Sequence, residues 1–224
     1  MRTTLFINSY HEKNPDRRNE LEICFENNLK AGFDIIHLIV ESKDENYAIE
    51  LTEKFPFGDT IIRITTVEHR PAFQKYIDIS NEDYEGNLIV VMNCDIFIEP
   101  AELQKIKDLP WNQKLYVPLS RFELTPEGAF PLERNDSADT FIFSSPCDIT
   151  TANCPLGYPG IENSLAWKFQ EKGYKVRNVS KSIITMHLQQ VKINNYRDEN
   201  GNVKAGMICK EPYAFHPPIK SEEI

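Results

Sequence analysis

The stretch of sequence that decides the fold is Gly86-Asn-Leu-Ile-Val-Val-Met-Asn-Cys-Asp-Ile-Phe-Ile-Glu99. Five apolar residues, Leu88 to Met92, lead into Asn93-Cys-Asp95, and three more apolar residues follow. A continuous apolar run between polar residues is typical of a strand buried on both faces, as in a parallel sheet. Such sheets bind ligands at the carboxyl ends of their strands, which is where this pattern puts Asp95.

Asp95 is a carboxylate between two apolar runs, and burying such a group is costly unless a partner compensates the charge. Three kinds of partner are open: a divalent metal, an Arg or Lys side chain, and hydrogen-bond donors on a bound sugar or ribose. The alternative is that Asp95 caps the next turn through its own backbone, as Asp often does.

Predicted strands and helices alternate over the first hundred residues. The strands are the apolar runs at 5–7, 35–40, 60–65 and 88–92. Helical spacing of apolar residues predicts helices at 19–31, 50–55 and 72–79. Gly32 is expected to end the first helix as a C-cap, and the polar segment 11–18 before it is expected to be a loop. This order predicts an α/β fold with an open, mainly parallel sheet flanked by helices.

The second half has a less regular order. Extended segments are expected at 115–119, 140–143, 176–179 and 183–186, with a helix after Glu162 that ends at Gly173. We therefore expect one domain over 1–197, made of a nucleotide-binding half (1–99) and a second half (100–197). Residues 198–224 are expected to form a C-terminal tail or linker.

Composition limits the possible partners and the compartment. The chain has 224 residues, 41% of them hydrophobic, which is enough for a full core without metal or disulfide staples. The net charge of −9 argues against a nucleic-acid partner, and an anionic substrate would need a local basic site or a bound cation. We expect no transmembrane segment and a cytoplasmic location, because no signal-peptide pattern and no long apolar stretch is present.

The five cysteines are irregularly spaced, at positions 24, 94, 147, 154 and 209. No CxxC pair occurs, so a zinc site of that type is not expected. Cys24 and Cys94 lie in apolar contexts and are expected to be small core residues. A disulfide between Cys147 and Cys154 is possible, although a free thiol in each is the main expectation.

Several polar residues follow predicted strands or begin a predicted helix, and the role of each has two possible interpretations. His187 is either a ligand of metal or phosphate, or a structural histidine. Glu162 is either a general base or a helix-start residue that favours the macrodipole. The loop carboxylates Asp136 and Asp139 can bind sugar hydroxyls or cations. The basic pairs Arg17-Arg18 and His69-Arg70 can bind a phosphate or a nucleobase, or simply face solvent.

The motifs of several other enzyme classes are missing. The sequence has no GxGxxG and no Walker A pattern, which argues against dinucleotide and P-loop chemistry. It has no GxSxG and no cysteine in a credible Cys-His setting.

Taken in order, eight short blocks resemble the GT-A type nucleotide-sugar-dependent glycosyltransferases, especially small soluble family-2-like members. The likeness extends from residue 3 to about residue 197. The blocks are Phe6-Ile-Asn-Ser-Tyr10, Arg18-Asn-Glu-Leu21, Arg70-Pro-Ala-Phe73, Val90-Val-Met-Asn-Cys-Asp-Ile96, Leu119-Ser-Arg121, Asp136-Ser-Ala-Asp-Thr-Phe-Ile-Phe143, Gly157-Tyr-Pro-Gly-Ile-Glu-Asn163 and Met186-His-Leu188.

The resemblance implies a GT-A (Rossmann-like) fold and roles for particular residues on the donor side. Asn93-Cys-Asp95 corresponds to the family's DxD element, with Asp95 as the ligand of a divalent metal, Mn²⁺ or Mg²⁺. His187 corresponds to a C-terminal histidine that completes metal or diphosphate binding. The nucleotide contacts implied are Ser9, Tyr10, Arg18, Arg70 and Asn93.

On the acceptor side, the resemblance implies that Glu162 is the catalytic base and that Asp139 lies near the junction of donor and acceptor. Two departures from the family pattern stand out, because Asn93 replaces the first Asp of the DxD element and Asn163 leaves Glu162 as the one acidic residue there.

The function implied is transfer of a sugar from a nucleotide-diphosphate sugar to a hydroxyl of a glycan or other acceptor, with inversion. The alternatives are a sugar nucleotidyltransferase and a non-catalytic domain that binds nucleotide sugars or glycans. A nucleotidyltransferase normally has a Gly-rich basic segment after the first strand, which Asn8-Ser-Tyr-His-Glu12 lacks.

Overall fold

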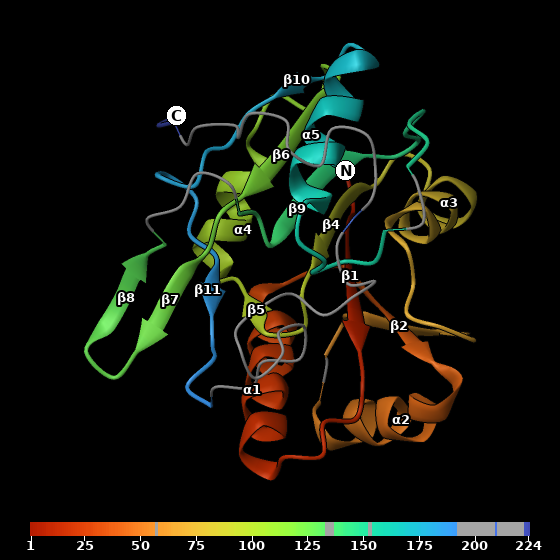
Figure 1. The fold of residues 1–224 in the computed structure, drawn as a ribbon, viewed down its shortest axis with the longest axis vertical. Coiled ribbons are helices and arrows are strands. Elements are labelled where there is room, and N and C mark those ends of the chain that lie inside the picture. The colour runs from red at the N-terminus through yellow and green to blue at the C-terminus, as the bar shows by residue number, and fades with distance from the viewer. Residues whose placement is uncertain (57, 133–136, 152–153, 192–208, 210–221) are drawn as a thin grey trace.

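The computed structural model describes residues 1–56, 58–132, 137–151, 154–191, 209 and 222–224. Its centre is a seven-stranded sheet in the order β10-β6-β9-β4-β1-β2-β3 (Figure 1). These strands are β1 (Thr3–Ser9), β2 (Ile35–Glu41), β3 (Ile61–Val67), β4 (Leu88–Met92), β6 (Leu115–Leu119), β9 (Thr140–Ser144) and β10 (Lys175–Val176). Neighbouring strands are parallel, except that β9 runs antiparallel to both β4 and β6. The predicted mixed, mainly parallel sheet is confirmed.

Helices cover both faces of this sheet. One face packs against α1 (Pro15–Ala31), α2 (Glu45–Lys54) and α4 (Pro100–Lys107), and the other against α3 (Phe73–Asp83) and α5 (Ile161–Glu171). A short 3₁₀ turn, η1 (Ser42–Asp44), precedes α2. Alternate residues of β4 enter the two cores, Val90 the first and Val91 the second, and all five residues of the strand are fully buried. Each such side chain contributes about 1.5–3 kcal/mol on burial, which explains why this strand is central.

A second, four-stranded sheet in the order β5-β11-β7-β8 lies beside the first. Its strands are β5 (Ile96–Phe97), β11 (Met186–His187), β7 (Phe122–Thr125) and β8 (Gly128–Pro131). β11 pairs antiparallel with β5 and parallel with β7, so His187 lies opposite both Ile96 and Glu123. This sheet was not predicted, and the extended segment expected at 183–186 overlaps it only at Met186.

Helix α1 begins four residues earlier than predicted, because Pro15 to Arg18 form its first turn rather than a loop. The side chain of Asn14 accepts hydrogen bonds from the backbone N–H groups of Asp16 and Arg17, which caps the helix. Pro15 stands at the first helical position, where its missing N–H has no cost. The expected C-cap at Gly32 is confirmed, with φ of 89°.

The disulfide joins Cys154 to Cys209, and Cys147 is a free, buried thiol, so a Cys147–Cys154 bridge is excluded. Because disulfides persist mainly in oxidising compartments, this bridge does not support the expected cytoplasmic location, which stays a prediction. No described helix is long and apolar enough to cross a membrane. The tail expected at 198–224 lies outside the described residues, apart from Cys209 and 222–224.

Candidate active site

Polar residues from four strands meet at the carboxyl edge of the large sheet. Ser9 ends β1, and Asn93 to Asp95 follow β4. Arg121 lies two residues after β6, and Asp139 stands directly before β9, which enters the sheet from the opposite direction. The strand order therefore brings together residues that are far apart in the sequence, as expected for a ligand site in an open α/β sheet.

Asp95 is the centre of a partly buried ion-pair network. Its Oδ2 lies 2.5 Å from Nη2 of Arg17 and 3.2 Å from Nε2 of His187. Burial alone would raise the pKa of Asp95, but the hydrogen bond from His187 and the charges of His187 and Arg17 outweigh it and lower the pKa to about 2. The sequence left the partner of Asp95 open between a metal, an Arg or Lys, and donors on a ligand. In the structure the partner is an Arg, and a His is present in addition.

His187 connects Asp95 to the small sheet. The imidazole is 2% exposed, and its Nδ1 lies 2.6 Å from Oε2 of Glu123 on β7. Burial opposes the charged form, yet hydrogen bonds to Asp95 and Glu123 outweigh it and raise the pKa of His187 to about 9. Without a metal, the imidazole is therefore a cation held between two carboxylates.

Arg17 ties the first turn of α1 to the chain that follows β11. Its Nη1 donates to Oε2 of Glu20 at 2.7 Å and to the carbonyl of Leu188 at 2.6 Å. Glu20 in turn accepts the backbone N–H groups of Gln190 and Val191, each at 2.9 Å. These contacts hold α1, Asp95 and residues 188–191 as one unit.

Arg18, the predicted nucleotide contact on this helix, does not join the network. Its Nη1 lies 2.8 Å from Nε2 of His11, at the exposed side of the helix. The role expected for Arg18 stays a prediction, and the structure brings its neighbour Arg17 to Asp95 instead.

The side chain of Asn93 forms a hydrogen bond with Asp139. The Asn93 amide donates to Oδ1 of Asp139 at 2.9 Å, and Nη1 of Arg121 lies 3.1 Å from the same oxygen. Burial raises the pKa of Asp139, and its Oδ2 is buried without a hydrogen-bond partner in the described part of the chain. An aspartate at position 93 would face this carboxylate directly, which gives a physical reason for the amide. Asp136 lies outside the described residues.

Arg70 packs under the loop before α5. Its Nη2 donates to the carbonyl of Leu156 at 2.5 Å, and its guanidinium lies 5.5 Å from the ring centre of Tyr158. Gly157 has a φ of 79°, and a Cβ there would lie 3.1 Å from Nη2 of Arg70 and 3.7 Å from Oδ1 of Asn93. The loop therefore passes directly over Arg70 and Asn93, and a side chain at Gly157 would crowd the guanidinium of Arg70.

Tyr10 and Glu162 lie on two sides of this edge. Burial raises the pKa of Tyr10, and the charge of Asp95 acts in the same direction, so its hydroxyl is near Asp95. Glu162 is in the first turn of α5 and is partly buried. Its charge adds to burial in raising the pKa of Tyr116, which places it close to that hydroxyl. Among the residues that the structure describes, the ion pairs around Asp95 do not include Glu162.

The donor atoms of Asp95 and His187 fit a divalent metal. Two ligands at right angles around an ion, each at about 2.1 Å, lie about 3 Å apart. Oδ2 of Asp95 and Nε2 of His187 are separated by 3.2 Å. Among the described residues, no group of three or more His, Cys, Asp and Glu side chains can hold a metal. These two residues could therefore hold an ion only if a bound ligand or water completed its coordination.

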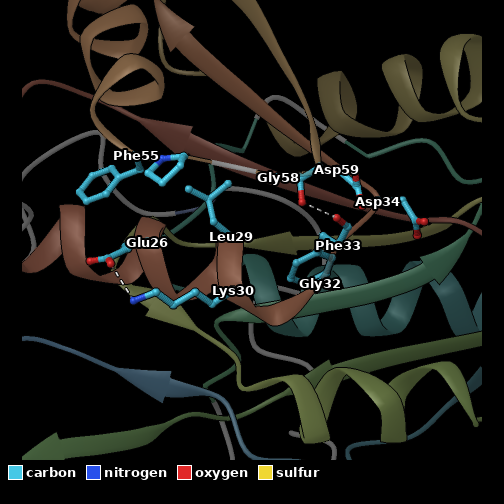
Figure 2. A pocket seen from close by; sticks show the side chains of 11 residues that line it. Glu26, Leu29, Lys30, Gly32, Phe33, Asp34, Phe55, Gly58 and Asp59 are labelled. Carbon is cyan, nitrogen blue, oxygen red and sulfur yellow. Dashed lines mark hydrogen bonds and ion pairs between the residues drawn. The ribbon is translucent and has the colours of Figure 1, made fainter.

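A separate hollow lies at the opposite end of the large sheet. It measures about 490 Å³ and is lined by the last turns of α1 and by the segments before β2 and β3, including Leu29, Phe33, Phe55 and Thr60 (Figure 2). Lys30 and Glu26 form an ion pair at its rim. Because it opens at the amino ends of the strands, it does not contain any of the predicted site residues.

Glu20, Arg121 and Glu123 were not predicted as members of the site, and Arg17 was considered only together with Arg18, as a possible contact of a phosphate or nucleobase. The pair Asn14-Pro15 is a helix-start signal, and it would have placed Arg17, Glu20 and Cys24 on one helical face with Arg18 turned away. For Glu123, the sequence offers no comparable signal, because its contact with His187 joins residues 64 apart in the chain.

The chain has a GT-A-like mixed α/β fold, as the comparison with solved structures shows; the sequence matches no family model and no curated protein. A mannosyltransferase from Pyrobaculum calidifontis, solved with GDP-Man and Mn²⁺, has a TM-score of 0.57 at 12% identity, over 84% of this chain and 58% of that one. The 4-diphosphocytidyl-2C-methyl-D-erythritol synthase of Anaerococcus prevotii has a TM-score of 0.52 at 14% identity, over 86% of this chain and 90% of that one. At sequence identities this low, the structural similarity is evidence for the fold alone.

Proposed function

We propose that this protein is a glycosyltransferase that moves a sugar from a nucleotide-diphosphate sugar to a hydroxyl of a glycan or other acceptor. The observation that carries the proposal is the pair Asp95 and His187, with atoms 3.2 Å apart just beyond the carboxyl end of β4. The similar mannosyltransferase, solved with GDP-Man and Mn²⁺, supports a donor of this class.

Asp95 and His187 are the residues that would hold Mn²⁺ or Mg²⁺. When bound, the cation supplies positive charge to the departing diphosphate. The need for such a cation is supported by the charges present: Glu20, Asp95, Glu123 and Asp139 are four carboxylates, whereas Arg17, Arg121 and His187 are three cationic groups. A diphosphate would otherwise meet a cluster of net negative charge.

The nucleotide binds beside the ends of β1 and β3 in this proposal. Ser9 and Tyr10 contact the base and ribose, and Arg70 and Arg18 supply further contacts. The buried position of Ser9 and the closeness of Tyr10 to Asp95 support this arrangement. Asn93 and Asp139 then face the sugar, which is supported by their mutual hydrogen bond and by the position of Asn93 next to Gly157 in the loop before α5.

Glu162 is the base in the proposed reaction. It takes the proton of the acceptor hydroxyl while that oxygen bonds to the anomeric carbon, and the bond from this carbon to the diphosphate oxygen breaks. Attack from the side opposite the leaving group inverts the configuration. The place of Glu162 in the first turn of α5, apart from the ion pairs of Asp95, supports separate acceptor and donor sides.

A nucleotidyltransferase is the second candidate, because the Anaerococcus prevotii synthase is covered over 90% of its length, against 58% for the mannosyltransferase. The segment Asn8-Ser-Tyr-His-Glu12 argues against it, since it lacks glycines and basic residues that could wrap a triphosphate. The third candidate is a domain that binds nucleotide sugars but does not catalyse a reaction.

The test is a panel of nucleotide sugars with Mn²⁺, with Mg²⁺ and with a chelator. Release of nucleoside diphosphate with transfer or hydrolysis of the sugar supports the proposal, pyrophosphate release from a nucleoside triphosphate supports the second candidate, and binding without turnover supports the third. Asp95→Ala should abolish transfer, whereas Asp148→Asn, at an exposed carboxylate, should retain it. Transfer by Asp95→Ala at a wild-type rate would contradict the proposed donor site.

A further inference from the structure

We infer that Glu123 is a positioning residue that fixes the imidazole of His187 so that Nε2 faces Asp95. This inference rests on the proposed metal site. The strand register is its starting point, since β11 and β7 pair with His187 directly opposite Glu123. The two side chains therefore emerge from adjacent strands, and neither must stretch to reach the other.

The hydrogen bond between them determines which ring nitrogen would keep its proton when a metal binds. Nδ1 of His187 lies 2.6 Å from Oε2 of Glu123, and Nε2 lies 3.2 Å from Oδ2 of Asp95. A carboxylate only accepts, so Nδ1 must donate. In the metal-free protein Nε2 likewise donates to Asp95, so Nε2 is the nitrogen whose proton a metal would displace, while the carboxylate behind Nδ1 orients the ring and makes it a better ligand.

Glu123 is itself held in place. Its Oε1 accepts from Nε of Arg121 at 2.8 Å, and Arg121 is anchored on Asp139 at 3.1 Å. Each oxygen of the Glu123 carboxylate thus has a separate donor. Rotation of the carboxylate away from His187 would break the contact with Arg121 as well, so the arrangement resists the ring flip that would turn Nε2 away from Asp95.

The hairpin that carries Glu123 contributes little to either main core. All four residues of β7 are partly exposed, and three of the four residues of β8 are exposed. In Figure 1 the hairpin projects from one side of the molecule while β11 lies against it. Placement of Glu123 beside His187 gives this pair of strands a role that burial of apolar surface does not explain.

The experiment compares the Mn²⁺ affinity of four proteins in the presence of GDP or UDP, by calorimetry and by the electron paramagnetic resonance signal of free Mn²⁺. They are the wild type, Glu123→Ala, Glu123→Gln and, as a matched control, Glu127→Gln, at an exposed position in the turn of the same hairpin. Loss of an outer carboxylate lowers metal affinity by about 10–100-fold, which we expect for Glu123→Ala. Glu123→Gln should lie between Glu123→Ala and the wild type, because its amide oxygen still accepts but carries no charge, and Glu127→Gln should bind like the wild type.

A second readout is the ¹⁵N chemical shifts of His187. In the Mn²⁺-free protein titrated with diamagnetic Mg²⁺ and GDP or UDP, the wild type should show protonated Nδ1, and Glu123→Ala should lose this preference. Thermal unfolding confirms that each variant folds, and the isosteric Glu123→Gln provides the comparison if Glu123→Ala does not fold. Equal Mn²⁺ affinity in wild type and in both folded Glu123 variants would overturn the inference alone. Absence of Mn²⁺ binding to the wild type would overturn the metal site, and the inference with it.

Discussion

Arg17 and Arg18 are neighbours in the first turn of α1 with opposite surroundings. Arg17 is 4% exposed and pairs with Asp95 and Glu20, whereas Arg18 contacts His11 at the exposed side. Removing one member of a buried ion pair leaves an uncompensated charge and costs about 3–5 kcal/mol. Surface substitutions are usually within about 0.5 kcal/mol.

We therefore expect Arg17→Met to lower the free energy of unfolding by about 3 kcal/mol or more, and Arg18→Met to change it little. Urea denaturation of the two variants at pH 7 measures this difference. Equal losses in the two would show that the ion pair with Asp95 does not support the fold.

Glu162→Gln separates catalysis from donor binding. Gln cannot take the proton of an acceptor hydroxyl, and general base catalysis contributes about 10²–10⁴-fold to a rate. We expect kcat to fall by that factor while the affinity for the nucleotide sugar stays unchanged. The control is Glu171→Gln, at the exposed last residue of the same helix, which should keep wild-type turnover. An unchanged kcat in Glu162→Gln would remove this residue from the base role.

At the scale of elements, His37 joins β2 to its surroundings. The imidazole is 2% exposed, with Nε2 2.7 Å from Oγ1 of Thr65 on β3 and Nδ1 2.8 Å from the hydroxyl of Tyr84 after α3. Burial, together with the charge of Arg63, lowers the pKa of His37 from 6.5 to about 4. The folded protein therefore keeps this ring neutral in a pH range where the unfolded chain binds a proton.

The stability that depends on His37 is complete above its unfolded pKa and is lost as the pH falls from 6.5 toward about 4. The loss amounts to about 3 kcal/mol, since each unit of pKa is worth about 1.4 kcal/mol. Urea denaturation at several pH values measures it. His37→Gln should lose less stability over this range than the wild type, and His69→Gln, at an exposed position, should lose as much. A wild-type pH dependence in His37→Gln would contradict the assignment.

The elements that could be predicted from the sequence are those whose apolar pattern is local. β1, β2 and β4 are continuous apolar runs, and their burial decides the large sheet. The small sheet could not be predicted, because β5 and β11 have two residues each and β7 is only half-buried. Strands this short are stabilised by pairing with distant segments, which local periodicity does not contain.

The candidate site likewise contains residues that could be predicted from the sequence and residues that could not. Asp95 follows a strongly predicted strand, and both Asp95 and His187 matched the order of blocks in a known family, so they could be named in advance. Arg17 was obscured by a misplaced helix start, although Asn14-Pro15 marked it. Glu123 depends on the pairing of β7 with β11, and only the folded chain reveals that register.

At the scale of the whole molecule, the excess of negative charge would make the proposed binding of metal and of nucleotide interdependent. The net charge is −9, so a nucleoside diphosphate alone is repelled, and a metal held by only two protein ligands is weakly bound. A ligand at 100 times its Kd stabilises the folded state by about 2.7 kcal/mol, equivalent to a Tm increase of about 5–10 °C for a chain of this size.

We expect Mn²⁺ and GDP or UDP together to raise Tm by about that amount, and more than the sum of either alone. Thermal scans of the wild type and of Asp95→Ala measure it, with the variant as the control in which the joint effect is lost. An increase of the same size in Asp95→Ala would show that binding occurs away from the end of β4.

The position of β11 has a consequence for the order in which the chain is made. This strand lies between β5 and β7, and Asp95 and His187 are 92 residues apart in the sequence. A ribosome adds about 5–20 residues each second, so about 5–20 seconds separate the emergence of the two side chains. Until then, the nascent chain has the large sheet's central strands but not the strand that closes the small sheet. The ion pairs around Asp95 are thus completed late, after most of the surrounding core has left the ribosome, although Cys209 and its disulfide follow.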